Sequence, residues 1–390
     1  MKKYKDVINV HIYPSPIITE ARIFKETKTL IAFGLVQKIH VLGISKPDLK
    51  NTQKLTDSIT INRIDTYFKN TDINKVKRYL SFIEFFIKLI FKAPKYKPSI
   101  VNCHSIHVLP AGAILKIITG CKLVYDAHEL ETEVTGAKGI LKFFAKYLER
   151  VCVFFVDEII VVNESISDFY KKIYPKKNVT AIYLLPEKDK EKKVTNNILR
   201  DKFSIPSDHI IFIFQGYLTV AKGALEVLNT FKKLSSNQHI IFLGNGPLTE
   251  EIILSSEQYP NIHYHPMVSS EELLDYTQCA DVGIAIVQNT SLSYYYISPN
   301  KLFEYLIAGI SIIASDLPEM RKVINETNSG WLIEPTSGNL FNLIQSIRKE
   351  DIDLKKSNIT TIDKKYSWES EKQKYIPIYN RLLNFSNNNV

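Results

Sequence analysis

Cysteine is scarce in this chain of 390 residues, and its four copies are scattered. They are Cys103, Cys121, Cys152 and Cys279, and no two of them form a Cys-x-x-Cys pair. This spacing argues against a zinc site and against a disulfide framework, and it suits a reducing cytosol. We therefore expect a cytoplasmic protein.

The chain also lacks an apolar run of the roughly 18–20 residues that a membrane span needs. Its most apolar segment, residues 79–91, has ten apolar positions in thirteen and contains Glu84 and Lys88. Basic residues flank this segment on both sides, and two interpretations stay open. It is a helix that covers the sheet, or a helix that lies in the membrane interface with its lysines against anionic head groups. The N-terminal segment is too short and polar for a signal peptide, and we expect it to lead into a first strand.

Acidic residues are outnumbered in the first half of the chain. Residues 1–185 contain 29 Lys and Arg against 17 Asp and Glu, a net charge of +12, whereas residues 186–390 contain 21 against 24, a net charge of −3. Only four of the 29 are Arg and no nucleic-acid-binding motif accompanies them, which argues against nucleic acid as the partner. An anionic membrane surface fits the lysine-rich half better, so we expect peripheral binding at the inner face of the plasma membrane.

Strand-like and helical segments alternate along nearly the whole chain, which predicts an α/β fold of parallel sheets with helices on both faces. A chain of this length suits two domains. The charged run at residues 186–193 contains no apolar side chain and predicts a solvated linker. We therefore expect one domain at residues 1–185 and a second at 186–367. The expected strands are at residues 7–12, 40–44, 100–103, 122–125 and 158–162, then 210–214, 240–243, 262–264, 280–284 and 310–315.

Residues 298–316 predict a helix with both ends marked, followed by a short strand. Ser298 is a residue of the N-cap type, Pro299 suits the first turn and Gly309 is a C-terminal stop. The first turn contains Lys301 and no acid, although a helix N-terminus favours anions. A bound diphosphate would resolve this conflict, because the helix N–H groups and the ammonium would share one partner.

Glu304 lies one turn after Lys301 and four residues after Asn300, so the three side chains can share one face. A carboxylate only accepts hydrogen bonds, and it suits the two hydroxyls of a ribose. These residues predict a nucleotide site. The alternative is that Lys301 and Glu304 form a solvated ion pair on the helix surface.

Glycine turns and polar residues follow several of the expected strands. Gly216 ends one strand shortly before Lys222, and Gly244 opens a Gly-x-Gly-Pro turn after the next, so both turns are candidate phosphate contacts. In the first half, His104 follows one strand, and Asp126, His128 and Glu129 follow another, at strand ends where ligands of α/β proteins gather.

The run Pro-Asn-Lys-Leu-Phe-Glu-Tyr at residues 299–305, then Ala-Gly and an apolar strand ending Ala-Ser-Asp, resembles the donor-site motif of family 4 of the retaining glycosyltransferases. The resemblance extends over most of the chain. It implies the GT-B fold, in which two doubly wound parallel-sheet domains face a cleft and the C-terminal segment, residues 368–390, packs back onto the first domain. It also implies metal-independent transfer of a hexosyl group from a nucleotide-diphosphate sugar to a glycan or lipid-linked acceptor in surface polysaccharide synthesis, without a cofactor.

The resemblance also assigns roles to residues. The run Tyr-Asp-Ala-His-Glu at residues 125–129 resembles a motif whose histidine faces the donor sugar, so His128 is the first candidate for the reaction centre. Asp126 is a candidate to orient it, Glu129 is a candidate acceptor contact or a helix cap, and Arg22 is a candidate acceptor or phosphate contact or a solvated helix residue. The implied catalytic residues are His128, Lys222, Lys301 and Glu304; the implied donor-binding residues are Gly216, Lys222, Gly244, Met267, Ser298, Pro299, Asn300, Lys301, Leu302 and Glu304; the acceptor-side candidates are Arg22, His104, Asp126 and Glu129.

Because of three departures from the family pattern, the identity of the donor stays open. The usual glycine-rich turn after the first strand is missing, since the first glycine is Gly34; the usual arginine after Gly216 is Tyr217; and the first of two glutamates eight positions apart is Tyr296. A nucleotide-sugar 2-epimerase and a non-catalytic sugar-nucleotide binding protein therefore remain alternatives. The Asp-x-Asp run at Asp351 and Asp353 is predicted to be a surface turn rather than a metal site.

Overall fold

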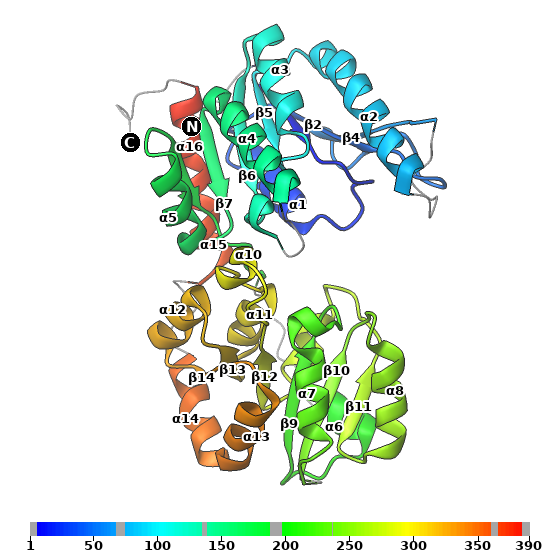
Figure 1. The fold of residues 1–390 in the computed structure, drawn as a ribbon, viewed down its shortest axis with the longest axis vertical. Helices are drawn as coiled ribbons and strands as arrows, with labels where there is room; N and C mark the ends of the chain where they lie inside the picture. The colour runs from blue at the N-terminus through cyan, green and yellow to red at the C-terminus, as the bar shows by residue number, and fades with distance from the viewer. Residues whose placement is uncertain are drawn as a thin grey trace. The chain divides into compact units, whose positions relative to one another are not determined.

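The computed structural model describes residues 6–67, 75–134, 139–187, 197–235, 237–359 and 366–383. The chain forms two compact units, Met1–Tyr183 with Lys372–Val390, and Leu184–Glu371 (Figure 1). Most of the expected linker, residues 188–193, lies outside the described residues. No helix in the described ranges combines the length and the apolarity needed to cross a membrane.

The first unit contains an eight-stranded sheet in the order β3-β4-β2-β1-β5-β6-β7-β8. All neighbours are parallel except β3 and β4, which pair antiparallel at one edge. The sequence patterns did not predict β3, β4 and β8, of which β3 is a short and fully exposed edge strand. The strands are β1 (Ile8–Ile12), β2 (Lys38–Ile44), β3 (Thr52–Lys54), β4 (Ile59–Ile64), β5 (Ile100–Cys103), β6 (Lys122–Ala127), β7 (Glu158–Val161) and β8 (Asn178–Ala181).

Helices connect these strands and cover the sheet. In one layer α2 packs against α3, and α3 packs against α4. The expected helix at residues 79–91 is the main part of α2. The helices of this unit are α1 (Ala21–Ala32), α2 (Lys75–Lys92), η1 (Ala93–Tyr96), α3 (Leu109–Thr119), η2 (Glu131–Glu133), α4 (Gly139–Phe155), α5 (Glu164–Ile173), η4 (Lys372–Lys374) and α16 (Tyr375–Leu382).

The C-terminal helix α16 belongs to the first unit, as the sequence resemblance implied. The hydroxyl of Tyr379 accepts hydrogen bonds from the side-chain amides of Asn9 (2.9 Å) and Asn102 (3.1 Å), which lie on β1 and β5. Arg381 forms an ion pair with Glu158 at 2.7 Å. Buried polar contacts therefore join the last helix to the strands of the first unit.

The second unit contains a six-stranded parallel sheet in the order β11-β10-β9-β12-β13-β14. This is the strand order of dinucleotide-binding Rossmann domains, in which the order reverses between the first and fourth strands, here β9 and β12. Its strands are β9 (Ile210–Gln215), β10 (Gln238–Leu243), β11 (Ile262–His265), β12 (Val282–Ala285), β13 (Ser311–Ser315) and β14 (Gly330–Ile333), of which only β14 was not expected. Its helices are α6 (Ile198–Phe203), η3 (Val220–Lys222), α7 (Ala224–Phe231), α8 (Thr249–Gln258), α9 (Leu273–Thr277), α10 (Leu292–Tyr295), α11 (Asn300–Ala308), α12 (Pro318–Thr327), α13 (Ser337–Ser346), α14 (Lys349–Ile359) and α15 (Trp368–Glu371).

The central strands of the second sheet are buried on both faces, which explains their continuous apolar sequences. Helix α11 packs closely on this sheet because Gly283 on β12 has no side chain. A Cβ there would lie 2.4 Å from the ring of Tyr305, whose hydroxyl is hydrogen-bonded to the backbone of Gln215 and Ile213. Tyr305 therefore places α11 at the carboxyl end of β9.

Two local predictions were wrong. Asp351 and Asp353 lie in α14 and not in a turn; Asp351 accepts a hydrogen bond from the backbone N–H of Arg348 (3.0 Å), which stabilises the start of that helix. The N-cap of α11 is Pro299 rather than Ser298, and no side chain caps this helix. The predicted stop at Gly309 is confirmed, since Gly309 has φ 74° and occupies the C-cap position.

Candidate functional site

The ammonium of Lys301 is the most unusual group in the second unit. It lies in the first turn of α11, its residue is only 7% exposed, and its Nζ has no hydrogen-bond partner among the described residues. Nζ instead lies 3.3 Å from the centre of the Phe214 ring on β9. Burial lowers the pKa of Lys301 well below its usual value, and the nearby Lys222 lowers it further. The alternative of a solvated ion pair with Glu304 is wrong, because the ammonium is buried.

Two glycine turns surround the same strand ends. Gly216 follows β9 with φ 102°, and Gly244 follows β10 with φ 149°. A Cβ on Gly244 would lie 1.9 Å from the carbonyl oxygen of Gly216, so the two turns touch and only glycine fits at position 244. Lys222 ends the short helix η3 directly before Gly223, and its Nζ lies 5.8 Å from the centre of the Tyr217 ring. The turns and both lysines thus gather at the carboxyl end of β9, beside the point where the sheet reverses its strand order.

Glu304 lies one turn further along α11 and is half-buried. One of its carboxylate oxygens accepts a hydrogen bond from the side-chain amide of Gln215. Burial raises the pKa of Glu304, while Gln215 and Lys301 oppose the rise. Gln215 is itself held by the hydroxyl of Thr277 at 2.8 Å. Glu304 is therefore oriented through one oxygen, and the other oxygen is the one suited to accept a hydrogen bond from a ligand.

The remaining predicted donor residues have different surroundings. The hydroxyl of Ser298 is buried and has no hydrogen-bond partner among the described residues. Asn300 is exposed, Leu302 is buried in the core, and Met267 is 70% exposed in the loop after β11. Of these, Ser298 stands out, since its unpaired hydroxyl lies three residues before the unpaired ammonium of Lys301.

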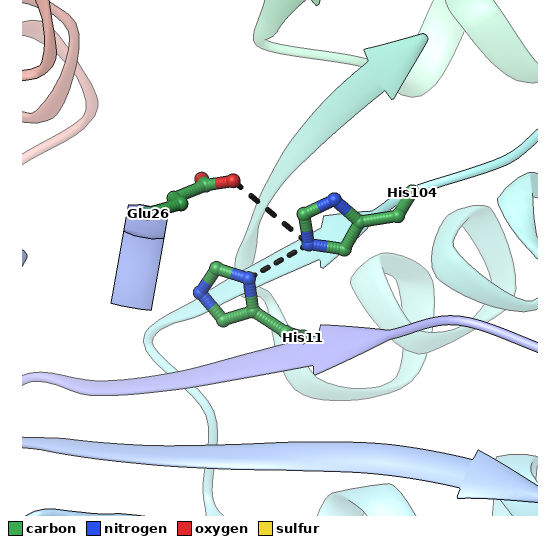
Figure 2. Close-up of side chains that lie close together, drawn as sticks. All are labelled: His11, Glu26 and His104. Atoms are coloured by element: carbon green, nitrogen blue, oxygen red, sulfur yellow. Dashed lines mark hydrogen bonds and ion pairs between the residues drawn. The ribbon is translucent and has the colours of Figure 1, made fainter. Parts of the chain in front are cut away.

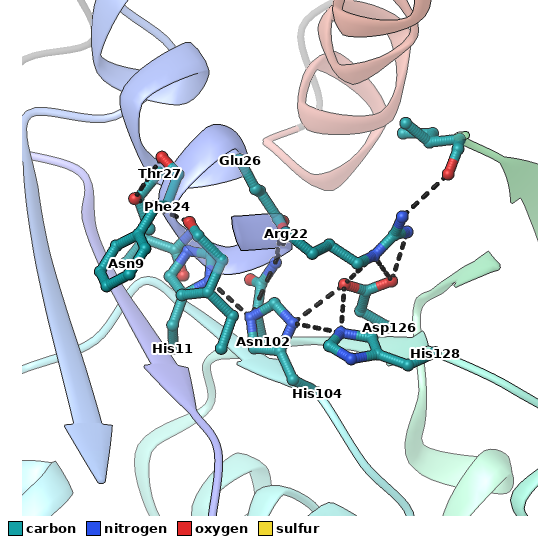
Figure 3. Close-up of polar contacts among 12 residues, drawn as sticks. Asn9, His11, Arg22, Phe24, Glu26, Thr27, Asn102, His104, Asp126 and His128 are labelled. Atoms are coloured by element: carbon teal, nitrogen blue, oxygen red, sulfur yellow. Dashed lines mark hydrogen bonds and ion pairs between the residues drawn. The ribbon is translucent and has the colours of Figure 1, made fainter. Parts of the chain in front are cut away.

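In the first unit, the buried carboxylate of Asp126 is the centre of a polar network (Figure 3). Arg22 from α1 binds both of its oxygens, through Nε at 2.9 and 3.1 Å and through Nη2 at 2.7 Å, and donates from Nη1 to the carbonyl of Ile182 at 2.8 Å. Burial would raise the pKa of Asp126, but Arg22, His128 and hydrogen bonds from His104 and His128 hold it well below its usual value. Arg22 is thus neither solvated nor open to a ligand; it fixes Asp126.

Three histidines extend from Asp126 along the carboxyl ends of β6, β5 and β1. His104 Nδ1 lies 2.9 Å and His128 Nε2 lies 3.3 Å from the same carboxylate oxygen, and His104 Nε2 lies 2.8 Å from His11 Nδ1. Because an ionised carboxylate only accepts, His104 donates from Nδ1 and accepts at Nε2, and His11 donates from Nδ1. Burial lowers the pKa of His104 and lowers that of His11 well below the usual value, so both are neutral. The side chain of His128 is 24% exposed, so His128 is the accessible end of this row of histidines.

Glu26 on α1 lies beside the two buried histidines, with one oxygen 4.0 Å from His104 Nε2 (Figure 2). That oxygen and Nε2 of His11 have no hydrogen-bond partner among the described residues, whereas the other oxygen of Glu26 accepts from Asn102 at 2.8 Å. His11, Glu26 and His104, and likewise His104, Asp126 and His128, bring enough ligand atoms together to hold a metal ion. A cation at either place would compete with existing hydrogen bonds, because both nitrogens of His104 are engaged.

The buried carboxyl group of Glu26 leads to a prediction about how stability depends on pH. Burial raises its pKa well above the usual value, and the Asp126 carboxylate raises it further, against Arg22 and Asn102. A raised folded-state pKa stabilises the fold fully below the unfolded-state pKa, and this stabilisation is lost as pH rises through the folded-state value. The always-neutral Glu26→Gln variant should therefore gain in melting temperature over the wild type as pH rises from acidic to mildly alkaline values. Thermal melts across this range measure the difference; a constant or shrinking difference would contradict it.

A control for that experiment is Asp168→Asn, which removes one carboxylate from an exposed position on α5. Glu131, whose pKa burial raises to about 8, and the buried Glu149 are unchanged in every variant, so their contributions cancel in the difference. Only the Glu26 comparison should depend on pH in the stated direction.

A family model matches most of the second unit. Residues 209–349 match the model of the group 1 glycosyl transferases. The matched range contains Gly216, Lys222, Gly244, Lys301 and Glu304, and it covers the second sheet together with its two glycine turns. The part of the chain that resembles the group 1 glycosyl transferases is therefore the part that carries the predicted nucleotide site.

Solved structures extend the likeness to both units. The chain resembles sucrose-phosphate synthase from Thermosynechococcus elongatus (TM-score 0.78, 15% identity, 97% of this chain and 100% of that one). It also resembles HepE from Anabaena, solved in complex with UDP (TM-score 0.71, 13% identity, 96% and 100%), and a glycosyltransferase from Rickettsia africae (TM-score 0.70, 15% identity, 98% and 100%). The fold is GT-B, with two Rossmann-like parallel-sheet units.

Sequence reasoning missed His11, Glu26 and Asn102 as members of the polar network. His11 and Asn102 are polar residues inside short, mainly apolar strands, which is the signal that could have drawn attention to them. Glu129, a predicted acceptor-side residue, is exposed, whereas Glu131, which was not predicted, accepts hydrogen bonds from Ser105 and Ile106.

Proposed function

We propose that this protein is a retaining glycosyltransferase that moves a sugar from a nucleotide-diphosphate sugar to a glycan or lipid-linked acceptor. The observation that carries the proposal is the buried ammonium of Lys301, which has no hydrogen-bond partner among the described residues and lies near a second lysine, Lys222. A buried cation without a partner is costly, and a diphosphate at the uncapped N-terminus of α11 would satisfy it. HepE, which has the same fold, was solved with UDP and with UDP-glucose, and this supports a nucleotide-sugar donor.

The residues support a mechanism in which the second unit stabilises the leaving group. Breaking the anomeric bond places negative charge on the diphosphate, and Lys222, Lys301 and the N–H groups at the start of α11 would stabilise that charge without help from a metal. Front-face attack with the departing phosphate accepting the acceptor proton would give retention. In the first unit His128, held by Asp126, is the proposed contact to the transferred sugar.

Surface polysaccharide synthesis at the inner face of the plasma membrane is the proposed setting, because the first half of the chain carries a net charge of +12. A 2-epimerase would need a fuller set of acid and base groups around the sugar. A non-catalytic binding protein would need only the nucleotide-sugar site and would not transfer the sugar.

The test is an incubation of the full chain with a panel of nucleotide sugars and a lipid-linked acceptor. Release of nucleoside diphosphate together with an extended acceptor whose anomeric configuration matches that of the donor is the expected result. An epimerised nucleotide sugar would indicate the epimerase instead, and binding without either product would indicate a binding protein.

Replacing Glu304 by alanine should weaken nucleoside-diphosphate binding more than tenfold. Loss of a hydrogen bond to a charged group costs about 1.5–3 kcal/mol, and Gln215 would also lose its acceptor. Titration calorimetry measures the affinity, with Glu250→Ala on the exposed start of α8 as the matched control. The proposed role of Glu304 is to accept hydrogen bonds from the ribose hydroxyls. An unchanged affinity in a folded Glu304→Ala variant would contradict that role.

A further inference from the structure

Helices α2, α3 and α4 form one layer of the first unit (Figure 1). Large apolar side chains on these three helices are exposed. Among the described residues, 15 of the 26 exposed large hydrophobic side chains belong to these three helices. Monomeric proteins rarely expose apolar patches beyond about 300–600 Å². The members of this apolar face are Val76, Tyr79, Leu80, Ile83, Ile87 and Phe91 on α2, Ile117 and Ile118 on α3, and Ile140, Phe143, Phe144, Tyr147, Leu148, Val151 and Phe154 on α4.

Helix α4 contributes the most residues to this face. Its sequence alone did not indicate that these residues would be exposed. Its exposed apolar residues recur every three or four positions, which places them on one side of the helix. Its one acid, Glu149, is turned inward, where the hydroxyls of Tyr125, Tyr170 and Tyr174 donate to it. Among the described side chains, the outward side of α4 therefore carries apolar and basic residues only.

The net charge of α2, α3 and α4 indicates which kind of partner this face would bind. They contain nine Lys and Arg and two acids, Glu84 and the buried Glu149. Asp157 and Glu133 from neighbouring segments pair with Lys116, Lys142 and Lys146, and an excess of positive charge remains. Apolar side chains on one side of an amphipathic helix with lysines and arginines around them are the composition of helices that lie in the interface of an anionic bilayer. Two copies of the chain meeting through this face would bring like charges together, which opposes self-association.

We propose that the α2–α3–α4 face docks onto an anionic lipid bilayer. Helices that connect parallel strands run antiparallel to them, so the N-terminal ends of α2 and α4 lie at the carboxyl edge of the sheet. The polar network of His104, Asp126 and His128 lies at this same edge. Docking would bring that edge next to the lipid head groups, where a lipid-linked acceptor would be presented; this last step rests on the proposed function, whereas the docking does not.

The experiment is flotation of the full chain with vesicles of phosphatidylcholine alone and of phosphatidylcholine mixed with phosphatidylglycerol. The wild type should float with the anionic vesicles, and high salt should weaken this binding because it screens the lysines. The double variant Phe143→Ser/Phe154→Ser removes two side chains that are 66% and 78% exposed. Its binding should be weaker by a factor of about ten or more, since each buried phenylalanine contributes strongly to interfacial binding.

The matched control is Leu254→Ser/Leu354→Ser, which removes two similarly exposed apolar side chains from the second unit and should float like the wild type. Absence of wild-type binding, or equal binding by Phe143→Ser/Phe154→Ser, would overturn the proposal. So would a wild-type dimer in sedimentation that this variant dissociates, because the face would then bind a second copy. Nucleoside-diphosphate affinity, measured by calorimetry on the same samples, should not change, so a failure of the donor site is distinguished from a failure of docking.

Discussion

Replacing Lys301 by methionine should raise the stability of the protein and at the same time strongly weaken nucleoside-diphosphate binding. In the unliganded site the Lys301 amino group is buried against the Phe214 ring, without a hydrogen-bond partner among the described residues. Methionine keeps the apolar stem and removes the group that burial destabilises, so the melting temperature should rise by about 2–4 °C. Loss of a buried charged contact to the diphosphate should weaken binding by about 30-fold or more.

The proton count of binding gives a second readout for Lys301. Burial and the nearby Lys222 lower its pKa well below the usual value in the free protein, whereas a bound diphosphate would favour the charged form. Binding to the wild type should therefore take up protons, which calorimetry detects in two buffers of different ionisation enthalpy. In Lys301→Met this uptake should fall.

Lys322→Met, which replaces an exposed lysine on α12, is the matched control and should leave both affinity and proton uptake unchanged. A nucleoside without phosphates should bind the wild type and Lys301→Met alike. If Lys301→Met lost stability and kept its diphosphate affinity, the lysine would be a structural residue and the donor site would have to lie elsewhere.

The candidate nucleotide site of the second unit could be predicted from sequence because its signals are local. A lysine in the first turn of a helix, glycines directly after apolar strands and a glutamate one turn below the lysine are all visible within short segments, and the structure brings them to one edge of the sheet. The sequence could not indicate that the side chain of Lys301 is buried. The burial of that side chain depends on Phe214, which is 87 positions earlier on another element.

The polar network of the first unit was less predictable because its contacts are long-range. Arg22 and Asp126 are 104 positions apart, and His11 and His104 are 93 apart, so no local pattern links them. The exposure of α4 was also hidden, since a segment rich in Phe and Leu is typical of a buried helix. The prediction at Asp351 was wrong because the polar stretch suggested a turn, although Ile352 anchors a helix in the core.

Breaking the Arg22–Asp126 pair should strongly destabilise the first unit. Arg22→Met leaves a buried carboxylate with only its histidine partners, and removing one member of a buried ion pair costs about 3–5 kcal/mol. Asp126→Asn leaves a buried guanidinium instead and should cost a similar amount. In the double variant no unpaired charge remains, so it should be more stable than the two single losses predict when added.

Chemical unfolding, with hydrogen exchange read at β1, β5 and β6, measures these losses within the first unit. The matched control is Arg321→Met, which breaks an Arg–Asp pair that is 49% and 43% exposed, and should change stability little. Because Asp126 also holds His104 and His128, Arg22→Met should expose the neighbouring strand ends to exchange before the rest of the sheet. Additive losses in the double variant would mean that the guanidinium and the carboxylate are stabilised independently, and that Arg22 does not position His128 through Asp126.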